Sequence, residues 1–227
     1  MIRKFSPQMG VLPPEQKQLW PALRPSAHLG FVLYGGTAIA LQLGHRSSVD
    51  FDFFTDQPMD RGRIYSAFPF LNASTLLQDQ PNTLSFLAPS TPGQQNRVKV
   101  SFFGGIAHGR VGEPRATDDD VLQVASLDDL MATKLKTILQ RIESKDYRDI
   151  VAMLKASVSL PKGLASATRM YGSANFQPSE CLKALVYFEG GDLNELSIPE
   201  KHELVRAVSA VRELPQVETV AKSLPLR

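Results

Sequence analysis

The amino-acid sequence predicts an α+β fold, with an α/β-like N-terminal half and a mostly helical C-terminal half. Up to residue 125, short apolar runs are separated by clusters of Gly, Pro, Asn and Ser, a pattern typical of strands joined by turns. Beyond residue 125, apolar residues recur at the spacing of buried helix faces. We therefore expect an α/β domain over residues 1–125 and a helical domain over residues 126–227.

In the N-terminal half, each expected element follows from its local pattern. Pro14 opens a helix because proline is favoured at the first helical position. Gly44 ends a short apolar helix, because glycine is the usual residue just beyond a helix C-terminus. Apolar runs bounded by turn residues predict strands. The expected order is helix 14–23, strand 31–34, a turn at Gly35-Gly36, helix 37–43, strand 49–54, a helix within 61–70, and strands 84–87 and 97–103.

The C-terminal half is expected to form a series of helices. Ser126-Leu127-Asp128-Asp129 resembles a capping box, because a carboxylate at the third helical position reaches back to the helix start. The apolar residues that follow form one helical stripe as far as Ile142. Further helices are expected at 145–154, 163–170, 179–188, 199–211 and 217–224.

The composition is that of an ordinary globular protein. The 227 residues are 43% apolar and 21% charged, and 25 basic against 23 acidic side chains leave a formal net charge of +2. This balance argues against a protein that coats nucleic acid or an anionic membrane. The single cysteine, Cys181, excludes an internal disulfide, and no run of about 18 uncharged apolar residues could span a membrane. We expect a cytoplasmic protein that does not bind membranes.

The most informative stretch joins a Gly-Gly turn to a pair of acids one strand later. Gly35 and Gly36 let the backbone approach a ligand closely, and the start of the following helix offers unpaired N–H groups to a phosphate. Thr37 adds a hydroxyl donor. On the next strand, the period of two places Asp50 and Asp52 on one face and the neighbouring phenylalanines on the other.

Two parallel carboxylates repel each other, and a hard cation relieves that repulsion. Mg²⁺ takes oxygen ligands, keeps several waters and bridges to substrate phosphates. Alone, the Gly-Gly pair is more often a structural turn, and an Asp-x-Asp pair a solvated strand edge. Their combination favours a site at Asp50 and Asp52 for one or two Mg²⁺ ions.

Basic side chains gather at the start of the helical half. They are Lys134, Lys136, Arg141, Lys145 and Arg148, against Glu143 and Asp146. All but Lys136 recur at helical spacings, so a continuous helix would present them on one face, suited to a triphosphate or a nucleic-acid backbone. A solvated helix face with internal Asp-Arg pairing is the alternative explanation.

Together these motifs resemble the AbiEii/AbiGii-type nucleotidyltransferase toxin family, a branch of the polymerase-β nucleotidyltransferase superfamily. The matching segments are 35–41, Arg46-x-Ser48-x-Asp50-x-Asp52-Phe53-Phe54, 126–130 leading to Lys134-Leu135, and 145–150. The resemblance covers about residues 31–155, and the last 70 residues match only as a helical tail. It implies a polymerase-β-like mixed sheet with helices, and a helical domain that completes the active-site cleft.

The resemblance also implies an activity and partners. The activity is transfer of a nucleoside monophosphate from a nucleoside triphosphate to an acceptor such as RNA or tRNA, by a toxin with a cognate antitoxin. Asp50 and Asp52 would hold Mg²⁺, and Asp146 or Asp149 would fill a later essential-acid position. The expected catalytic residues are Asp50, Asp52, Lys134, Asp146 and Asp149. The expected nucleotide-binding residues are Gly35, Gly36, Thr37, Arg46, Ser48, Lys134, Arg141, Lys145 and Arg148.

The sequence departs from the superfamily pattern at Ser101. Many polymerase-β-like transferases carry a third carboxylate on the strand expected here at 97–103. A serine hydroxyl binds water but supplies no negative charge. Three explanations stay open: Asp146 or Asp149 substitutes, the substrate supplies the missing ligand, or the protein is a catalytically inactive nucleotide-binding or protein-interaction module on the same fold.

Overall fold

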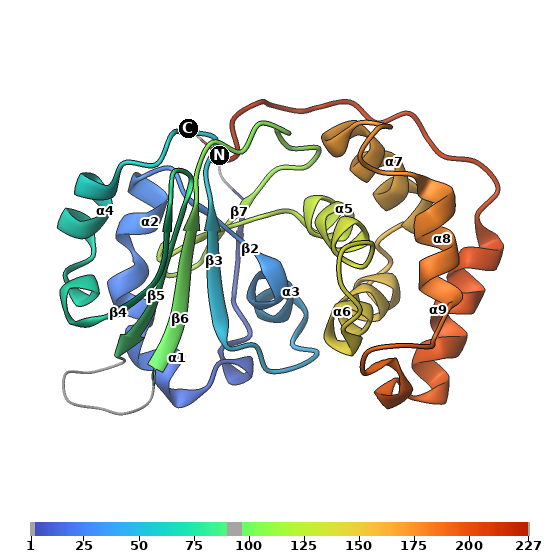
Figure 1. Cartoon of the computed structure of the whole chain (residues 1–227), viewed down its shortest axis with the longest axis horizontal. Helices are drawn as coiled ribbons and strands as arrows, with labels where there is room; N and C mark the ends of the chain where they lie inside the picture. The colour runs from blue at the N-terminus through green and yellow to red at the C-terminus, as the bar shows by residue number, and fades with distance from the viewer. Residues whose placement is uncertain (1–2, 90–96, 227) are drawn as a thin grey trace. The chain divides into compact units, whose positions relative to one another are not determined.

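The short apolar runs of the N-terminal half form the strands of one mixed sheet, in a computed structural model that describes residues 3–89 and 97–226 (Figure 1). The strands are β1 (Lys4–Phe5), β2 (Val32–Tyr34), β3 (Asp50–Phe54), β4 (Thr75–Gln80), β5 (Thr83–Pro89), β6 (Arg97–Phe103), β7 (Arg115–Thr117) and β8 (Gln123–Val124). With the helices of the C-terminal half, this sheet confirms the predicted α+β class.

The sheet has eight strands in the order β1-β7-β8-β2-β3-β6-β5-β4. Strand β3 pairs antiparallel with β2 and parallel with β6, and β6 pairs antiparallel with β5. Because β2 and β6 flank β3, side chains of three consecutive strands lie next to the predicted acid pair.

One face of the sheet packs into the apolar core. Phe51, Phe53 and Phe102 are fully buried on it. The ring of Trp20 packs on Phe51 at 6.3 Å between centroids, and that of Phe68 on Phe102 at 5.2 Å. The helical segments of this half are η1 (Met9–Val11), α1 (Pro14–Leu19), η2 (Trp20–Leu23), α2 (Pro25–His28), α3 (Gly35–Leu43), α4 (Arg61–Ala67) and η3 (Pro69–Ala73). Figure 1 shows α2 and α4 to the left of the sheet and α3 to its right.

Several local expectations in this half needed correction. The predicted helix 14–23 changes to a 3-10 helix at Trp20, because Pro21 has no N–H to continue the α-helical bonding. Gly35 and Gly36 are the first two residues of α3 rather than a turn before it. Strand β4 was not predicted, since all its residues are exposed and it lacks apolar alternation.

The C-terminal half is helical, as predicted. Its elements are α5 (Leu127–Thr137), α6 (Ser144–Lys155), α7 (Leu160–Tyr171), α8 (Pro178–Val186), η4 (Leu193–Glu195) and α9 (Ile198–Ala210). The described residues contain no helix long and apolar enough to cross a membrane.

Two of the expected helices in this half differ from the structure. The apolar stripe predicted as far as Ile142 is helical only as far as Thr137, where α5 ends. Helix α6 begins at Ser144, close to the start of the separate helix expected at 145–154, so the basic cluster does not lie on one continuous helix. The amide and hydroxyl of Ser144 both donate to the Asp192 carboxylate, at 2.6 and 2.7 Å, so a residue far along the chain starts the second helix. The predicted helix 217–224 is absent: Leu224 is buried in an irregular segment and its amide donates to Asp56 Oδ1 at 3.0 Å.

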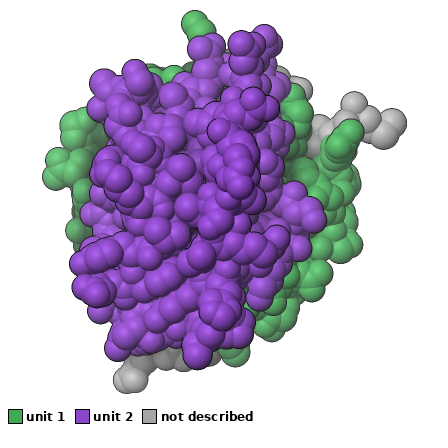
Figure 2. All heavy atoms as spheres, turned by 90° about the vertical axis from the view of Figure 1, so that its right-hand side faces the viewer, with its two compact units in different colours: residues 1–109, 113–125, 221–227 green, residues 110–112, 126–220 purple. Residues whose placement is uncertain are grey.

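The chain divides into two compact units, which are coloured in Figure 2. Unit 1 consists of residues 1–109, 113–125 and 221–227, and unit 2 of residues 110–112 and 126–220. Segment 110–112 belongs to unit 2 because the amides of Val111 and Gly112 donate to the Asp129 carboxylate at the start of α5. Burial raises the pKa of Asp129 to about 6, against the opposing effect of hydrogen bonds from Ser126 and these amides.

Candidate active site

Asp50 and Asp52 lie on the face of β3 opposite the apolar core. Burial alternates along the strand: both acids are half-buried, whereas Phe51 and Phe53 are fully buried. Asp52 is in register with Tyr34 at the end of β2. The two carboxylates therefore project next to the place where β2 becomes helix α3.

Gly35 is required at this junction. Its φ of +76° lies in the left-handed region that favours glycine, and a Cβ built on it would lie 2.8 Å from Asp52 Oδ2. A Cβ on Gly36 would lie 2.4 Å from a terminal nitrogen of Arg46. The two glycines bring the start of α3 into direct contact with one acid and one guanidinium.

The polar side chains predicted to border the triphosphate gather at the same junction. The Thr37 hydroxyl, which is buried, makes hydrogen bonds with Ser48 Oγ at 2.8 Å and with the Asp50 carbonyl. Arg46 donates to the Ser47 carbonyl at 2.9 Å. Thr37 thus fastens helix α3 to the start of the acid-bearing strand.

The first turn of α3 has the features of an anion site. Its N-cap residue, Tyr34, makes no side-chain hydrogen bond to the helix start. The first backbone N–H groups of a helix have no partner within the helix, and together with the positive end of the helix dipole they favour a phosphate. The Arg46 guanidinium next to Gly36 adds a positive charge there. These features would hold negative charge beside Asp50 and Asp52.

Ser101 occupies the position at which a third carboxylate was expected. It is in register with Asp52 on the parallel strand β6, and it is fully buried. Among the described residues, no group of three or more His, Cys, Asp or Glu side chains is placed to hold a metal ion. Within unit 1 the acid pair therefore has a hydroxyl neighbour where the superfamily pattern has an acid.

Lys134, Asp146 and Asp149 form a buried ionic cluster inside unit 2. The Lys134 ammonium lies 2.6 Å from Asp146 Oδ1 and 2.8 Å from Asp149 Oδ2. The side chains of both acids are fully buried, and that of Lys134 is 7% exposed. Asp146 also accepts from Arg141 Nε at 2.8 Å. The structure thus brings together the lysine and both acids that the sequence assigned to catalysis in this half.

The Asp146 carboxyl is held in its ionised form. Burial opposes ionisation, but hydrogen bonds and charge from Arg141 and Lys134 outweigh it and keep the pKa of Asp146 below its ordinary value. The ionisation of Asp146 therefore depends on these two cations.

Lys145 and Arg148 lie outside this cluster and have carboxylate partners of their own. Lys145 lies 2.7 Å from Glu143, and Arg148 lies 3.5 Å from Glu200. Arg148 also donates to the Glu195 carbonyl at 2.8 Å. Glu143 is a neighbour in sequence, but no local pattern indicates Glu195 and Glu200 as partners of Arg148, because they are some 50 positions away along the chain.

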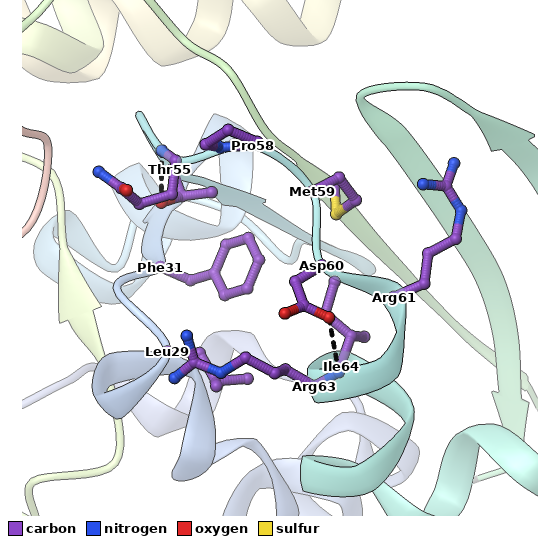
Figure 3. A pocket seen from close by; sticks show the side chains of 10 residues that line it. Leu29, Phe31, Thr55, Pro58, Met59, Asp60, Arg61, Arg63 and Ile64 are labelled. Atoms are coloured by element: carbon purple, nitrogen blue, oxygen red, sulfur yellow. Dashed lines mark hydrogen bonds between the residues drawn. The ribbon is translucent and has the colours of Figure 1, made fainter.

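A separate hollow of about 480 Å³ lies at the other end of strands β2 and β3 (Figure 3). Phe31 precedes β2 and Thr55 follows β3, and both line it together with Asp60 and Arg63. Asp60 accepts from the Arg63 amide at 3.0 Å and so caps helix α4. This hollow contains none of the predicted site residues.

A mixed sheet with two acids on a central strand, next to a helix that begins with two glycines, is the arrangement expected from the resemblance to polymerase-β-like nucleotidyltransferases. A family model described as "Nucleotidyl transferase AbiEii toxin, Type IV TA system" matches residues 19–221. The chain therefore belongs to the AbiEii nucleotidyltransferase toxin family, as the sequence motifs predicted, and is a nucleotidyltransferase.

The chain is also similar to a protein of known sequence and to proteins of known structure. An uncharacterized protein of Aquifex aeolicus (strain VF5) is 32% identical over 181 residues, which are 77% of this chain and 83% of that protein. Two solved structures share the fold, each with a TM-score of 0.55. An antigenic nucleotidyltransferase-like protein from Paracoccidioides brasiliensis is 16% identical, with 88% of this chain and 94% of that one covered. MenT4, a nucleotidyltransferase toxin from Mycobacterium tuberculosis H37Rv, is 13% identical, with 87% and 91% covered.

Proposed function

We propose that this protein transfers a nucleoside monophosphate from a nucleoside triphosphate to an RNA acceptor, with tRNA as the first acceptor to test, in a Mg²⁺-dependent reaction. The observation that supports this most directly is the close approach of Gly35 to Asp52. Through this contact the first turn of α3, which we propose binds phosphate, adjoins a pair of acids on one strand.

The donor chemistry of the acid pair fits Mg²⁺. Asp50 and Asp52 offer half-buried carboxylate oxygens on one face of β3, and Gly35 leaves space beside Asp52 Oδ2 that a Cβ would fill. With two protein carboxylates, the remaining ligands are water and substrate oxygens, as is usual for this ion. When bound, Mg²⁺ neutralises phosphate charge and orients the phosphates.

The residues of unit 1 position the triphosphate. The amides of Gly35 and Gly36 and the Arg46 guanidinium bind its phosphates, while Thr37 and Ser48 hold α3 against β3 so that this geometry persists. The acceptor hydroxyl oxygen bonds to the α-phosphorus, the bond from that phosphorus to the bridging oxygen breaks, and pyrophosphate leaves. The hydroxyl proton passes to solvent.

Lys134 has two roles in the proposal. It contacts a phosphate of the nucleotide, as its family motif implies, and it pairs with Asp146 and Asp149 inside unit 2. We assign the later essential acid to this pair. Arg141, Lys145 and Arg148 are proposed to contribute positive charge near the nucleotide, although their present partners are carboxylates.

The biological role follows from the family. We propose that the protein acts in the cytoplasm, where nucleoside triphosphates and tRNA are available, and that a cognate antitoxin counteracts it. Growth arrest on expression, relieved by the neighbouring gene and absent for the Asp52→Asn variant, would be the cellular counterpart of the transfer reaction.

Labelled transfer tests the assignment directly. The protein is incubated with each α-³²P-labelled nucleoside triphosphate, Mg²⁺ and total tRNA. We expect label in the tRNA band, loss of label with EDTA, and at least about a 100-fold lower rate for Asp52→Asn. The exposed acid Glu213, changed to Gln, is the matched control and should transfer at the wild-type rate.

Two outcomes would contradict the proposal. Transfer that survives in Asp52→Asn would remove the acid pair from the reaction. Tight, Mg²⁺-independent nucleotide binding without transfer to any acceptor would instead favour the inactive binding module.

A further inference from the structure

Strand β6 presents three side chains on the same face as the acid pair. Lys99 is in register with Asp50, Ser101 with Asp52, and Phe103 with Phe54. Residues in register on neighbouring strands lie on the same face of a sheet. The two residues between them on β6, Val100 and Phe102, are fully buried on the opposite face.

Strand β6 carries no acid on this face, in contrast to β3. Ser101 is fully buried, and its Oγ has no hydrogen-bond partner among the described residues. A buried hydroxyl without a partner is costly, so a ligand that forms a hydrogen bond with Ser101 Oγ would relieve that cost. The half-buried Lys99 ammonium makes no ion pair or hydrogen bond to a described residue. Strand β6 therefore offers a positive charge and a hydroxyl.

Phe103 adds a third kind of contact. Its ring is half-buried and meets the ring of Phe54 at 5.0 Å between centroids. A cation for phosphate, a hydroxyl for sugar and an aromatic ring for a base are the contacts by which proteins bind single-stranded RNA. A nucleic-acid duplex would leave Phe103 without a base to stack on.

The strand order separates this surface from the glycines of α3. Strand β2, which leads into Gly35, lies on one side of β3, and β6 lies on the other. A triphosphate at Gly35 and Gly36 therefore has the acid pair between itself and β6. In an in-line transfer the acceptor approaches the phosphorus from the side opposite the leaving pyrophosphate. With the triphosphate at α3, we infer that this side is the one on which β6 lies.

We propose that the face of β6 that carries Lys99, Ser101 and Phe103 binds the single-stranded end of the RNA acceptor. Lys99 pairs with a backbone phosphate, Ser101 hydrogen-bonds to a sugar hydroxyl, and Phe103 stacks on a base. This inference rests on the proposed function and adds where the acceptor binds and through which residues. It also gives Ser101 a role in acceptor binding in place of a carboxylate.

Binding measurements on the full chain test the proposal. A fluorescently labelled tRNA transcript is titrated at several salt concentrations, and binding of Mg²⁺ with a non-hydrolysable nucleoside triphosphate is measured by calorimetry. Lys99→Ala should weaken tRNA binding about tenfold and reduce the salt slope by about 0.7. Phe103→Leu should weaken tRNA binding to a similar extent. Both variants should bind the nucleotide as the wild type does.

Matched variants separate charge from fold. Lys17→Ala removes an exposed lysine from helix α1 and should leave tRNA binding unchanged. Lys99→Arg should retain binding. Ser101→Asp should weaken tRNA binding, whereas a decayed metal site would gain Mg²⁺ affinity from the same change. Circular dichroism melting checks that each variant is folded. If Ser101→Asp does not fold, Lys99→Ala still tests the proposal.

The outcomes distinguish this inference from the proposed function. Wild-type tRNA binding and transfer that Lys99→Ala and Phe103→Leu both leave unchanged would overturn the β6 assignment and leave the activity intact. Lys99-dependent tRNA binding without transfer of any nucleotide would overturn the activity and retain the surface. A wild-type chain that binds no tRNA would overturn both.

Discussion

The Lys134 ammonium lies between two fully buried carboxylates, and each of the three charges depends on the others. Ions are costly to bury, and their mutual attraction offsets that cost only while the set is complete. Arg141 forms an ion pair with Asp146, and Lys134 forms an ion pair with Asp149. Lys134 is therefore a structural residue as well as a candidate phosphate contact.

Lys134→Met should destabilise the protein because it leaves two buried carboxylates with reduced compensation. We expect the free energy of unfolding at pH 7.5 to fall by about 3 kcal/mol. Lys136→Met, which removes a neighbouring ammonium that donates to the Asn175 carbonyl, should cost under about 1 kcal/mol. Urea unfolding measures both. Equal midpoints would show that the Lys134 charge does not hold the cluster together.

The difference in the free energy of unfolding between the wild type and Lys134→Met should depend on pH. The pKa of Asp146 is lower in the folded state than its ordinary value of 3.8, because bonds from Arg141 and Lys134 outweigh burial. Its stabilising contribution is therefore complete above about pH 4 and is lost as the pH falls through the folded-state pKa. The difference between wild type and Lys134→Met should shrink below pH 4.

At the scale of elements, helix α3 begins and ends on glycines with positive φ. Gly35 has φ +76° and Gly44 has φ +67°. A Cβ on Gly44 would contact Gln8 Cγ at an ordinary 3.4 Å, whereas a Cβ on Gly35 would lie 2.8 Å from Asp52 Oδ2. A residue with a Cβ would therefore be strained at either end, and only the first end adjoins the acid pair.

Gly35→Ala and Gly44→Ala form a matched pair. Each should lower the free energy of unfolding by about 1 to 2 kcal/mol, because a residue with a Cβ is strained in the left-handed region. Only Gly35→Ala should lose nucleotidyl transfer, since its methyl group displaces the Asp52 carboxylate. Thermal melts and the tRNA-labelling assay measure the two effects. An active Gly35→Ala variant would show that the close approach is not needed.

At the scale of the whole molecule, the chain returns to unit 1 at its end. Within segment 221–226, Leu224 is fully buried and its amide donates to Asp56 Oδ1, and the Leu226 amide donates to Gln123 Oε1 at 2.9 Å. Burial opposes the ionisation of Asp56, but the bond from Leu224 and others hold its pKa below its ordinary value. The last residues are therefore part of the unit that carries the acid pair.

Leu224→Ala should destabilise unit 1, because truncating a buried leucine costs about 2 to 4 kcal/mol. Leu214→Ala, at a leucine that is 39% exposed, should cost under about 0.5 kcal/mol. Chemical denaturation of the full chain compares them. Similar values for both would mean that the C-terminal segment contributes little to the fold.

Local patterns predicted much of the candidate site. The alternation Asp50-Phe51-Asp52-Phe53 predicted which side chains enter the core, and burial along β3 agrees. Strand β6 has the bounds expected for it, 97–103. These predictions succeed because the period of a strand depends only on neighbouring residues.

Other features depend on partners far along the chain. Asp192 accepts hydrogen bonds from Ser144, the first residue of α6, which lies 48 positions earlier in the chain. Asp56 binds the segment that was expected to be a helix at 217–224. Exposed β4 forms a strand because β5 supplies its hydrogen bonds, and not through any apolar pattern of its own.

Short-range periodicity was enough to predict the fold class and the acid pair with its glycines, and the order of the motifs indicated the family by resemblance. Which residues meet depends on the folded chain: Lys134 contacts Asp146 and Asp149, Asp52 lies against Gly35, and Ser101 and Lys99 lie beside the acids. Strand register and helix packing join residues that are distant in sequence, and no local pattern records those pairings.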